Sequence, residues 1–221
     1  MLLEVNQATK LYKRGTEEFK AVDNASLSLN PGEYAVINGQ SGSGKSTLLA
    51  IIAGLLNLDS GQASFDGTDI GTLGDKKLSA LRNEKIGFIP QGQCLLSNFT
   101  IIDNVALPGL LAKRKNSRER AKALLDRLGI ARLANQYPAR LSGGEIRRAA
   151  IARGLINEPK LVVADEPTSD LDPANSLNIF ELFNEIALSG AAVLVVTHES
   201  QKPNGCHKRY LMNDGVLLLE S

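Results

Sequence analysis

Short, uninterrupted apolar runs recur along the chain and predict buried strands. In chain order they are residues 34–38, 86–89, 161–164 and 191–196. Strands that are apolar on both faces are typical of parallel sheets covered by helices. Helical patterns accompany them, over residues 48–54, which stop at a glycine, and from Pro173 to about Leu188. The pattern therefore predicts an α/β protein with a parallel core.

Other segments alternate apolar and polar residues, as half-buried strands do. Residues 2–8 and 25–29 have this alternation, and residues 62–66 predict a further strand that ends in a turn at Gly67. Together they predict a small, largely antiparallel layer. Residues 75–83 look helical, and residues 209–212 and 216–219 predict a hairpin that turns at Asn213-Asp214-Gly215.

The middle of the chain has a different pattern, because residues 100–141 contain no β-rich run. Apolar residues at helical spacing predict a helix from Ser117, as its N-cap, to Leu128, with Gly129 as its stop. Pro108 should kink or end the segment before it. We expect one domain, in which residues 1–91 and 158–221 form the core and residues 92–157 an inserted helical lobe.

A glycine-rich stretch follows the first buried strand and precedes a helix. It consists of Gly39, Gln40, Ser41, Gly42, Ser43, Gly44, Lys45, Ser46 and Thr47. This is the phosphate-binding loop pattern, in which Lys45 reaches the β/γ-phosphates and the Ser46 hydroxyl is a ligand for Mg²⁺. The helix that opens at Thr47 presents its positive end to an anion. An accidental glycine turn is the alternative, but the strand–loop–helix context favours ATP binding.

Two adjacent carboxylates, Asp165 and Glu166, end the run 161–164. At the C-terminal edge of a parallel sheet they can face the phosphates, where Asp165 would hold Mg²⁺ and Glu166 would orient or deprotonate an attacking water. An acidic turn is common by itself. In a chain with a phosphate loop, the catalytic interpretation is favoured.

A second anion-binding pattern occurs at Leu141-Ser142-Gly143-Gly144-Glu145, before a predicted helix. A serine and two glycines at a helix start can bind an anion, and a simple helix cap is the alternative. One phosphate loop is sufficient for one nucleotide, so a second such site needs an explanation.

Composition narrows the function classes. The 221 residues are 43% hydrophobic with a formal net charge of +1, so no global field would recruit nucleic acid. Cys94 and Cys206 have no paired spacing, which favours free thiols in a reducing compartment. No targeting segment is visible and the longest apolar run is about half of the ~20 residues that span a bilayer. We expect a soluble chain that reaches a membrane only through a partner.

The motifs together resemble the ATP-binding cassette (ABC) ATPases over essentially the whole chain. In order, they are the phosphate loop at 39–46, Gln91 after a short strand, the signature sequence at 141–145, Asp165-Glu166, Ser169-Asp170-Leu171-Asp172 and His198. The resemblance implies a phosphate-loop NTPase core of the RecA-like kind, with an antiparallel β layer and an inserted α-helical lobe. It also implies a head-to-tail pair of copies, with each ATP held between the phosphate loop of one and the signature of the other.

Individual roles follow from the same resemblance. Ser142, Gly143, Gly144 and Glu145 would face the ATP of the partner, and Asp172 would lie in the loop that crosses the dimer interface. Gln91 would sense Mg²⁺ and the attacking water, and His198 would contact the γ-phosphate. Tyr12 would stack on adenine, although an ordinary strand-end aromatic is its alternative.

Three positions depart from the pattern of the family. Ile146 stands where glutamine is frequent, which should alter contacts near the ribose. Pro90 replaces an aromatic residue before Gln91, and Ser169-Asp170 replaces a pair that is usually small or contains glycine. These departures affect the path of the loop at Gln91 and the coupling between the two sites.

Parts of the chain resemble the lipoprotein-release and macrolide-export branch of the family, namely residues 66–70, 78–82, 86–91, 95–96, 100–108 and 164–168. The resemblance implies the ATPase subunit of a transporter with an integral membrane permease as partner, which would hold the chain at the cytoplasmic face of the cell membrane. A regulatory cassette that controls cell-wall remodelling is the first alternative, and a non-transport cassette the second.

Two surface features leave alternatives open. Leu95, Leu96 and Phe99 would dock a cytoplasmic helix of the permease or simply pack the helical lobe. A basic cluster, Lys113, Arg114, Lys115, Arg118, Arg120 and Lys122, would meet anionic lipid headgroups or form a solvated helix face. The sequence alone favours the solvated face.

Overall fold

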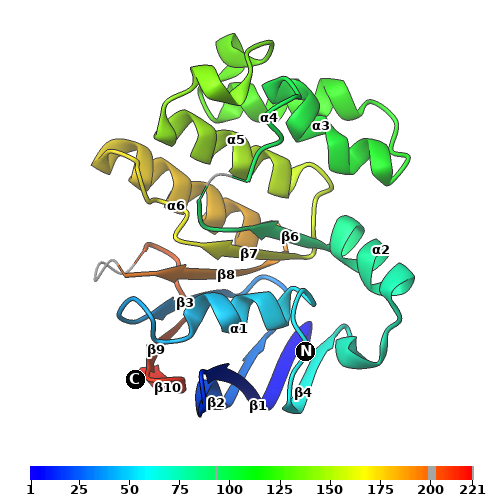
Figure 1. The fold of residues 1–221 in the computed structure, drawn as a ribbon. Coiled ribbons are helices and arrows are strands. Elements are labelled where there is room, and N and C mark those ends of the chain that lie inside the picture. Colours follow the sequence, from blue (N-terminus) through cyan, green and yellow to red (C-terminus); the bar gives the residue numbers. More distant parts are fainter. Residues whose placement is uncertain (93, 199–202, 221) are drawn as a thin grey trace.

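Two sheets and a group of helices build the molecule (Figure 1). The structure, a computed structural model, describes residues 1–92, 94–198 and 203–220. The larger sheet has six strands in the order β10-β9-β3-β8-β7-β6, and the smaller has four in the order β2-β1-β4-β5. The sequence prediction of a mixed α/β fold with an antiparallel layer and a set of helices is confirmed.

The six-stranded sheet is parallel except for its last strand. Its strands are β3 (Tyr34–Asn38), β6 (Ile86–Ile89), β7 (Leu161–Asp165), β8 (Ala192–Thr197), β9 (Lys208–Asn213) and β10 (Val216–Glu220). Only β10 runs antiparallel, in the predicted hairpin with β9. Every residue of β3, β7 and β8 is buried, which explains their uninterrupted apolar sequences.

Successive residues of the central strands point into two different cores. Ala35 and Ile37 of β3 face a cluster that includes α1 and the antiparallel sheet, whereas Tyr34 and Val36 face a cluster built from the helices α3 to α6. This division follows from the two-residue period of a strand. The parallel sheet therefore joins two cores in one molecule.

The antiparallel sheet consists of β1 (Leu3–Arg14), β2 (Glu17–Leu29), β4 (Ser60–Phe65) and β5 (Thr68–Asp69). The hairpin of β1 and β2 is longer than predicted, because it continues past residue 8 to a turn at Gly15. Its outer part, residues 12–20, is exposed and polar, so it carries no buried stripe that a pattern could reveal.

The helices lie on both faces of the parallel sheet. They are α1 (Lys45–Ile52), α2 (Asp75–Lys85), α3 (Ile101–Leu111), α4 (Ser117–Arg127), α5 (Gly143–Leu155) and α6 (Pro173–Leu188), with short 3-10 turns at Ile70–Thr72, Ala131–Leu133 and Pro138–Arg140. In Figure 1, α1 lies between the two sheets, while α3, α4 and α5 form a separate layer beyond α6. None of the described helices is long and apolar enough to cross a membrane.

Two local predictions in the helical layer are revised. Pro108, expected to kink or end the segment before it, does not end the helix, since α3 continues to Leu111. Ser117 is not an N-cap: Asn116 takes that position in a left-handed conformation, and the Ser117 hydroxyl donates instead to the carbonyl of Arg114. The serine hydroxyl can form hydrogen bonds with backbone groups that precede or follow it. A sequence pattern therefore locates such an N-cap only to within one residue.

Candidate nucleotide site

A cleft of about 580 Å³ lies at the C-terminal ends of the parallel strands. Its lining comprises Tyr12, Phe19, Ala21, Ser41, Gly42, Gly44, Lys45, Ser46, Thr47, Gln91, Asp165, Glu166 and His198. Most of the residues predicted from the sequence for ATP, Mg²⁺ and catalysis thus meet in one cavity. Segments far apart in the chain supply them because parallel strands bring their ends to one edge of the sheet.

The phosphate loop wraps around the amino group of Lys45. Lys45 Nζ donates to the carbonyls of Gly39 at 2.8 Å and Gln40 at 2.7 Å, and the side chain is buried. Gly44 has φ +101°, and a Cβ there would lie 1.9 Å from the carbonyl oxygen of Ala21. Only glycine fits at that position, and the loop is thereby pressed against β2 with the start of α1 open to the cleft.

Asp165 ends β7 as a buried carboxylate, and its Oδ1 has no hydrogen-bond partner among the described residues. Burial raises the pKa of Asp165, the Ser46 hydroxyl lowers it, and the neighbouring Glu166 raises it further. An unpartnered, buried carboxylate oxygen is unfavourable in a protein without a compensating group. A divalent cation supplies such a group, so Asp165 with Ser46 suits Mg²⁺.

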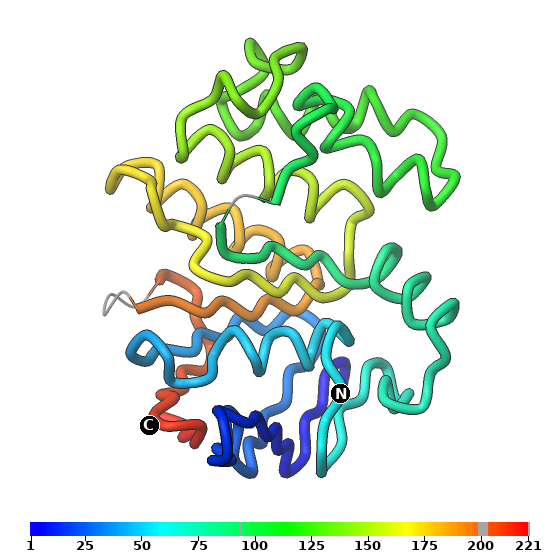
Figure 2. Tube along the Cα trace, viewed as in Figure 1, coloured from blue at the N-terminus to red at the C-terminus, as the bar shows by residue number. Residues whose placement is uncertain are grey.

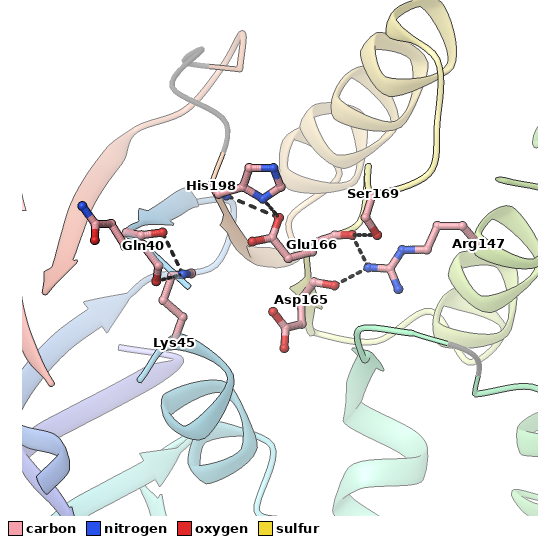
Figure 3. Close-up of polar contacts among 8 residues, drawn as sticks. Gln40, Lys45, Arg147, Asp165, Glu166, Ser169 and His198 are labelled. Atoms are coloured by element: carbon pink, nitrogen blue, oxygen red, sulfur yellow. Dashed lines mark hydrogen bonds and ion pairs between the residues drawn. The ribbon is translucent and has the colours of Figure 1, made fainter. Parts of the chain in front are cut away.

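Glu166 follows Asp165 and is held by His198 (Figure 3). Its Oε2 lies 2.9 Å from His198 Nδ1 and accepts from the backbone N–H of His198 at 3.3 Å. The backbone of Glu166 has φ +49°, an uncommon conformation for a residue with a side chain, and its N–H donates to Val196. The carboxylate is therefore fixed by β8 as well as by β7, while the imidazole of His198 is largely exposed.

Two aromatic side chains close the end of the cleft at the antiparallel sheet. Tyr12 of β1 and Phe19 of β2 are cross-strand partners, with ring centroids 6.0 Å apart and an angle of 30° between the rings. Phe19 is 48% exposed and was missed by the sequence analysis, since it lies in the exposed part of the hairpin that no pattern predicted. Together the rings offer an apolar surface to a planar base.

Arg147 is the second functional residue that the sequence analysis missed. It lies one turn inside α5 and is buried, and its guanidinium donates to the carbonyls of Asp165 and Glu166 (Figure 3). It also donates to the carbonyl of Pro90. Burial lowers the pKa of Arg147, and the carboxylates nearby act against that effect. The side chain ties α5 to both carboxylate-bearing positions and to the residue before Gln91.

The signature residues lie elsewhere. Ser142 is the N-cap of α5, and its hydroxyl and backbone form a reciprocal capping box with Glu145. Hydrogen bonds from Ser142 lower the pKa of Glu145. Gly143 and Gly144 lie against the backbone and side chain of Asp170 and Leu171. Residues 142–145 are absent from the lining of the cleft, so a single chain does not bring signature and phosphate loop together.

The remaining predicted residues have distinct surroundings. Asp172 is the N-cap of α6, where the N–H of Asn175 lowers its pKa. Gln91 is exposed at the rim of the cleft. Ser43 is buried with an unpartnered hydroxyl, and Gln40 lines a neighbouring pocket of about 550 Å³. In the described part of the chain, Cys94 and Cys206 form no disulfide, and no group of three or more His, Cys, Asp or Glu side chains is placed to hold a metal ion.

Comparison with known proteins decides the family. The model of the family described as "ABC transporter" matches residues 22–169. The chain belongs to the ABC transporter family. It is also similar to solved structures of MJ0796, described as a bacterial ABC transporter cassette: one dimeric structure matches with 35% identity and a TM-score of 0.95, over 100% of this chain and 98% of the other.

A second structure of MJ0796, a dimeric post-hydrolysis state bound to ADP and phosphate, matches over the same shares of the two chains, with 35% identity and a TM-score of 0.94. The chain is therefore an ABC ATPase cassette, and its structural neighbours are dimers. This confirms the family, the fold and the nucleotide-binding character that the motifs indicated.

Proposed function

We propose that this cassette binds ATP in the 580 Å³ cleft and hydrolyses it to ADP and phosphate. The observation that carries the proposal is the meeting of Lys45 with the adjacent Asp165 and Glu166 in that one cleft, from two separate segments of the chain. A buried cation and two buried carboxylates, next to a helix start, match the needs of phosphoryl transfer to water.

The phosphates would lie against the phosphate loop. Lys45 would donate to the β/γ-phosphates, and the backbone N–H groups of residues 41–47 and the start of α1 would donate to their oxygens. The adenine would rest on Tyr12, with Phe19 behind it supporting the ring through their contact. The exposed hairpin and the phosphate loop would thus hold opposite ends of one nucleotide.

Ser46 and Asp165 would hold Mg²⁺, with Gln91 completing the set from the rim. The fit rests on the unpartnered Oδ1 of Asp165, on the raised pKa of this carboxyl, and on the hard oxygen donors at the site. When bound, Mg²⁺ neutralises charge on the β- and γ-phosphates.

Glu166 would orient the attacking water and accept its proton as the oxygen–phosphorus bond forms and the bond to ADP breaks. His198, held against Glu166, would approach the γ-phosphate. Ser142, Gly143, Gly144 and Glu145 of a second copy would close the site from the other side, with Asp172 near the interface. Charge stabilisation of this kind provides most of the acceleration in phosphoryl transfer.

Replacing Glu166 by glutamine tests the proposal. We expect Glu166→Gln to bind ATP and form a dimer in its presence, and kcat to fall by about 10² to 10⁴-fold because the general base is lost. Steady-state phosphate release and size-exclusion chromatography with Mg-ATP provide the readouts, and Glu158→Gln, an exposed acid outside the cleft, is the control. Near-normal turnover of Glu166→Gln would show that Glu166 is not the general base.

We further propose that the cassette is the ATPase subunit of a transporter, peripheral on the cytoplasmic face of the membrane through an integral membrane permease of the lipoprotein-release, macrolide or antimicrobial-peptide export type. The resemblance of residues 66–70, 78–82, 86–91, 95–96, 100–108 and 164–168 to that branch supports this. A regulatory cassette for cell-wall remodelling is the alternative. Affinity purification separates the classes: a four-span permease with a large extracytoplasmic domain supports the branch, and a ribosomal partner contradicts it.

A further inference from the structure

The turn between α3 and α4 concentrates positive charge. Residues 113–122 contain six basic side chains and one acidic one, in a chain whose formal net charge is only +1. Arg118 pairs with Asp103 and Arg120 with Glu158. Lys113, Lys115 and Lys122 are exposed and form no ion pair within the described residues. Their charges are therefore available to an external partner.

Two leucines are exposed directly beside this charge. Leu110 is 53% exposed and Leu111 is 68% exposed, at the last turn of α3. Both precede Lys113 in the turn, so apolar and cationic side chains belong to one protruding element. Scattered exposed leucines are normal, but an adjacent pair at the tip of a basic turn is a feature of surfaces that enter a bilayer interface.

The turn is a folded platform. The N–H groups of Lys113 and Arg114 donate to the carbonyls of Leu110 and Gly109, both at 2.9 Å. Lys113 and Asn116 adopt left-handed conformations that reverse the chain within a few residues. A Cβ on Gly109 would lie 2.7 Å from the Ser117 hydroxyl, so the two helices approach closely at their ends. Little ordering would therefore be needed when the turn meets a partner.

The turn also lies away from the candidate nucleotide cleft. In Figure 2 the green turn between the two helices projects at the right-hand edge, whereas the phosphate loop before α1, in light blue, lies toward the left. Asn83 of α2 donates to the carbonyl of Pro108, which places the end of α3 on the side of α2. A partner could occupy the turn without entering the cleft.

We propose that this turn and the helix ends that flank it, Leu110 to Lys122, form a membrane-contact surface. This surface would bind anionic phospholipid headgroups while Leu110 and Leu111 enter the bilayer interface. Charge complementarity selects an anionic partner, and the leucine pair selects a bilayer over a nucleic acid, because residues 101–122 contain no aromatic side chain on which a base could stack. This contact needs no permease, and it would align the cassette against the bilayer beside one.

Vesicle co-sedimentation of the full chain without nucleotide tests the proposal. We expect binding to vesicles of phosphatidylglycerol mixed with phosphatidylcholine, and little binding to phosphatidylcholine alone. Raising the salt from about 0.1 M to 0.5 M should release the protein, because screening shortens the reach of the charges. Lys113→Glu with Lys115→Glu should weaken binding by at least about tenfold, and Leu110→Ser with Leu111→Ser by several-fold.

Lys13→Glu with Arg14→Glu is the matched control, since it makes the same change in net charge at the exposed tip of the β1–β2 hairpin. It should bind vesicles as the wild type does. The lysine and leucine variants of the turn should keep the wild-type melting temperature, whereas the control sets acidic side chains opposite Glu18 and Glu17 and needs only to show a cooperative thermal transition. Equal binding to neutral and anionic vesicles, an equal loss in the control, or no loss on reversing the charges of the two lysines would each overturn the proposal.

Binding of a single-stranded RNA that matches the vesicle affinity and depends on the same lysines would also overturn it, in favour of a nucleic-acid surface. ATPase activity does not enter these readouts, so a failed vesicle test leaves the proposed hydrolysis unaffected.

Discussion

At the scale of single residues, the cleft contains groups that oppose folding. Asp165 is a buried carboxylate with an unpartnered oxygen and a raised pKa, and Glu166 beside it has a left-handed backbone. Unfavourable groups of this kind persist where a ligand compensates for them. The arrangement suits a cation and a nucleotide, and it lowers the stability of the folded chain when neither is bound.

Replacing Asp165 by asparagine should therefore stabilise the ligand-free chain. A carboxyl whose pKa is higher in the folded state binds its proton more tightly there, so the ionised residue lowers stability above the folded-state pKa. At pH 8 we expect Asp165→Asn to gain about 1 kcal/mol in the free energy of unfolding, or about 2–4 °C in Tm. Below the unfolded-state pKa of about 4 both forms are neutral and the gain should vanish.

Thermal unfolding followed by circular dichroism at pH 8 and at about pH 3, below the unfolded-state pKa, measures this difference. Asp126→Asn, an exposed acid on α4, is the control and should change Tm little at either pH. With Mg-ATP present the order should reverse, because only the wild type gains the binding energy of the ion. A loss of ligand-free stability at pH 8 would contradict the explanation.

At the scale of elements, α5 connects two functions. Its first turn displays the signature residues, and its second turn carries Arg147, which donates to the carbonyls that follow β7 and to Pro90 after β6. A shift of α5 would therefore move the ends of both strands together. The helix links the surface offered to a second copy with the carboxylates of its own cleft.

Arg147→Met should destabilise the protein by about 3 kcal/mol, since it leaves buried carbonyls without donors. It should also lower kcat more than it raises KM for ATP. Arg147 positions Asp165 and Glu166, but it contacts neither the aromatic residues at the expected adenine position nor the phosphate loop. Urea unfolding and ATPase kinetics check both effects.

Arg153→Met, in the same helix, is the matched control. Arg153 donates to the carbonyl of Cys94 alone among the described residues, so its replacement should cost about 1 kcal/mol and spare kcat. Arg147→Lys should recover part of the turnover if position and charge matter. Equal kinetic effects of the two methionine variants would show that Arg147 has only a structural role.

Helices and strands were largely predictable from the sequence wherever their buried residues form a regular pattern of apolar positions. The fully buried strands β3, β7 and β8, the helix α6 and the final hairpin appear as predicted, because each has a continuous or periodic apolar signal. The phosphate loop was predictable because only glycine tolerates the contact at Gly44. The outer β1–β2 hairpin, and with it Phe19, was not, since it packs against little and its sequence is polar.

Arg147 was not predictable for a different reason. A charged residue on a helix is expected at the surface, and only the positions of Pro90, Asp165 and Glu166 in three dimensions provide it with buried partners. The end of α3 shows the same limit: tertiary packing, including the bond from Asn83 to the carbonyl of Pro108, supports a helix that the local signal would stop.

At the scale of the whole molecule, one copy keeps the phosphate loop and the signature residues apart. The phosphate loop and carboxylates line one cleft, while the signature residues lie outside it on an exposed helix start. The solved structures of MJ0796 that match this chain are dimers. A head-to-tail pair would bring each signature onto the phosphate loop of the other copy, and this arrangement makes a prediction that no single-copy site makes.

Two defective variants should complement each other in a mixed dimer. Lys45→Ala disables the phosphate loop and Ser142→Arg the signature, both in a Glu166→Gln background that prevents turnover of bound ATP. Neither variant alone should retain ATP through rapid gel filtration, because every composite site in its dimer has one defective half. In an equal mixture, one site of each mixed dimer combines an intact phosphate loop with an intact signature, so retained ATP should reach about a quarter of that held by Glu166→Gln alone, given random two-fold pairing. Retention by Ser142→Arg alone at the full level, or no recovery in the mixture although mixed dimers form, would mean that each copy binds its nucleotide without the signature of the other.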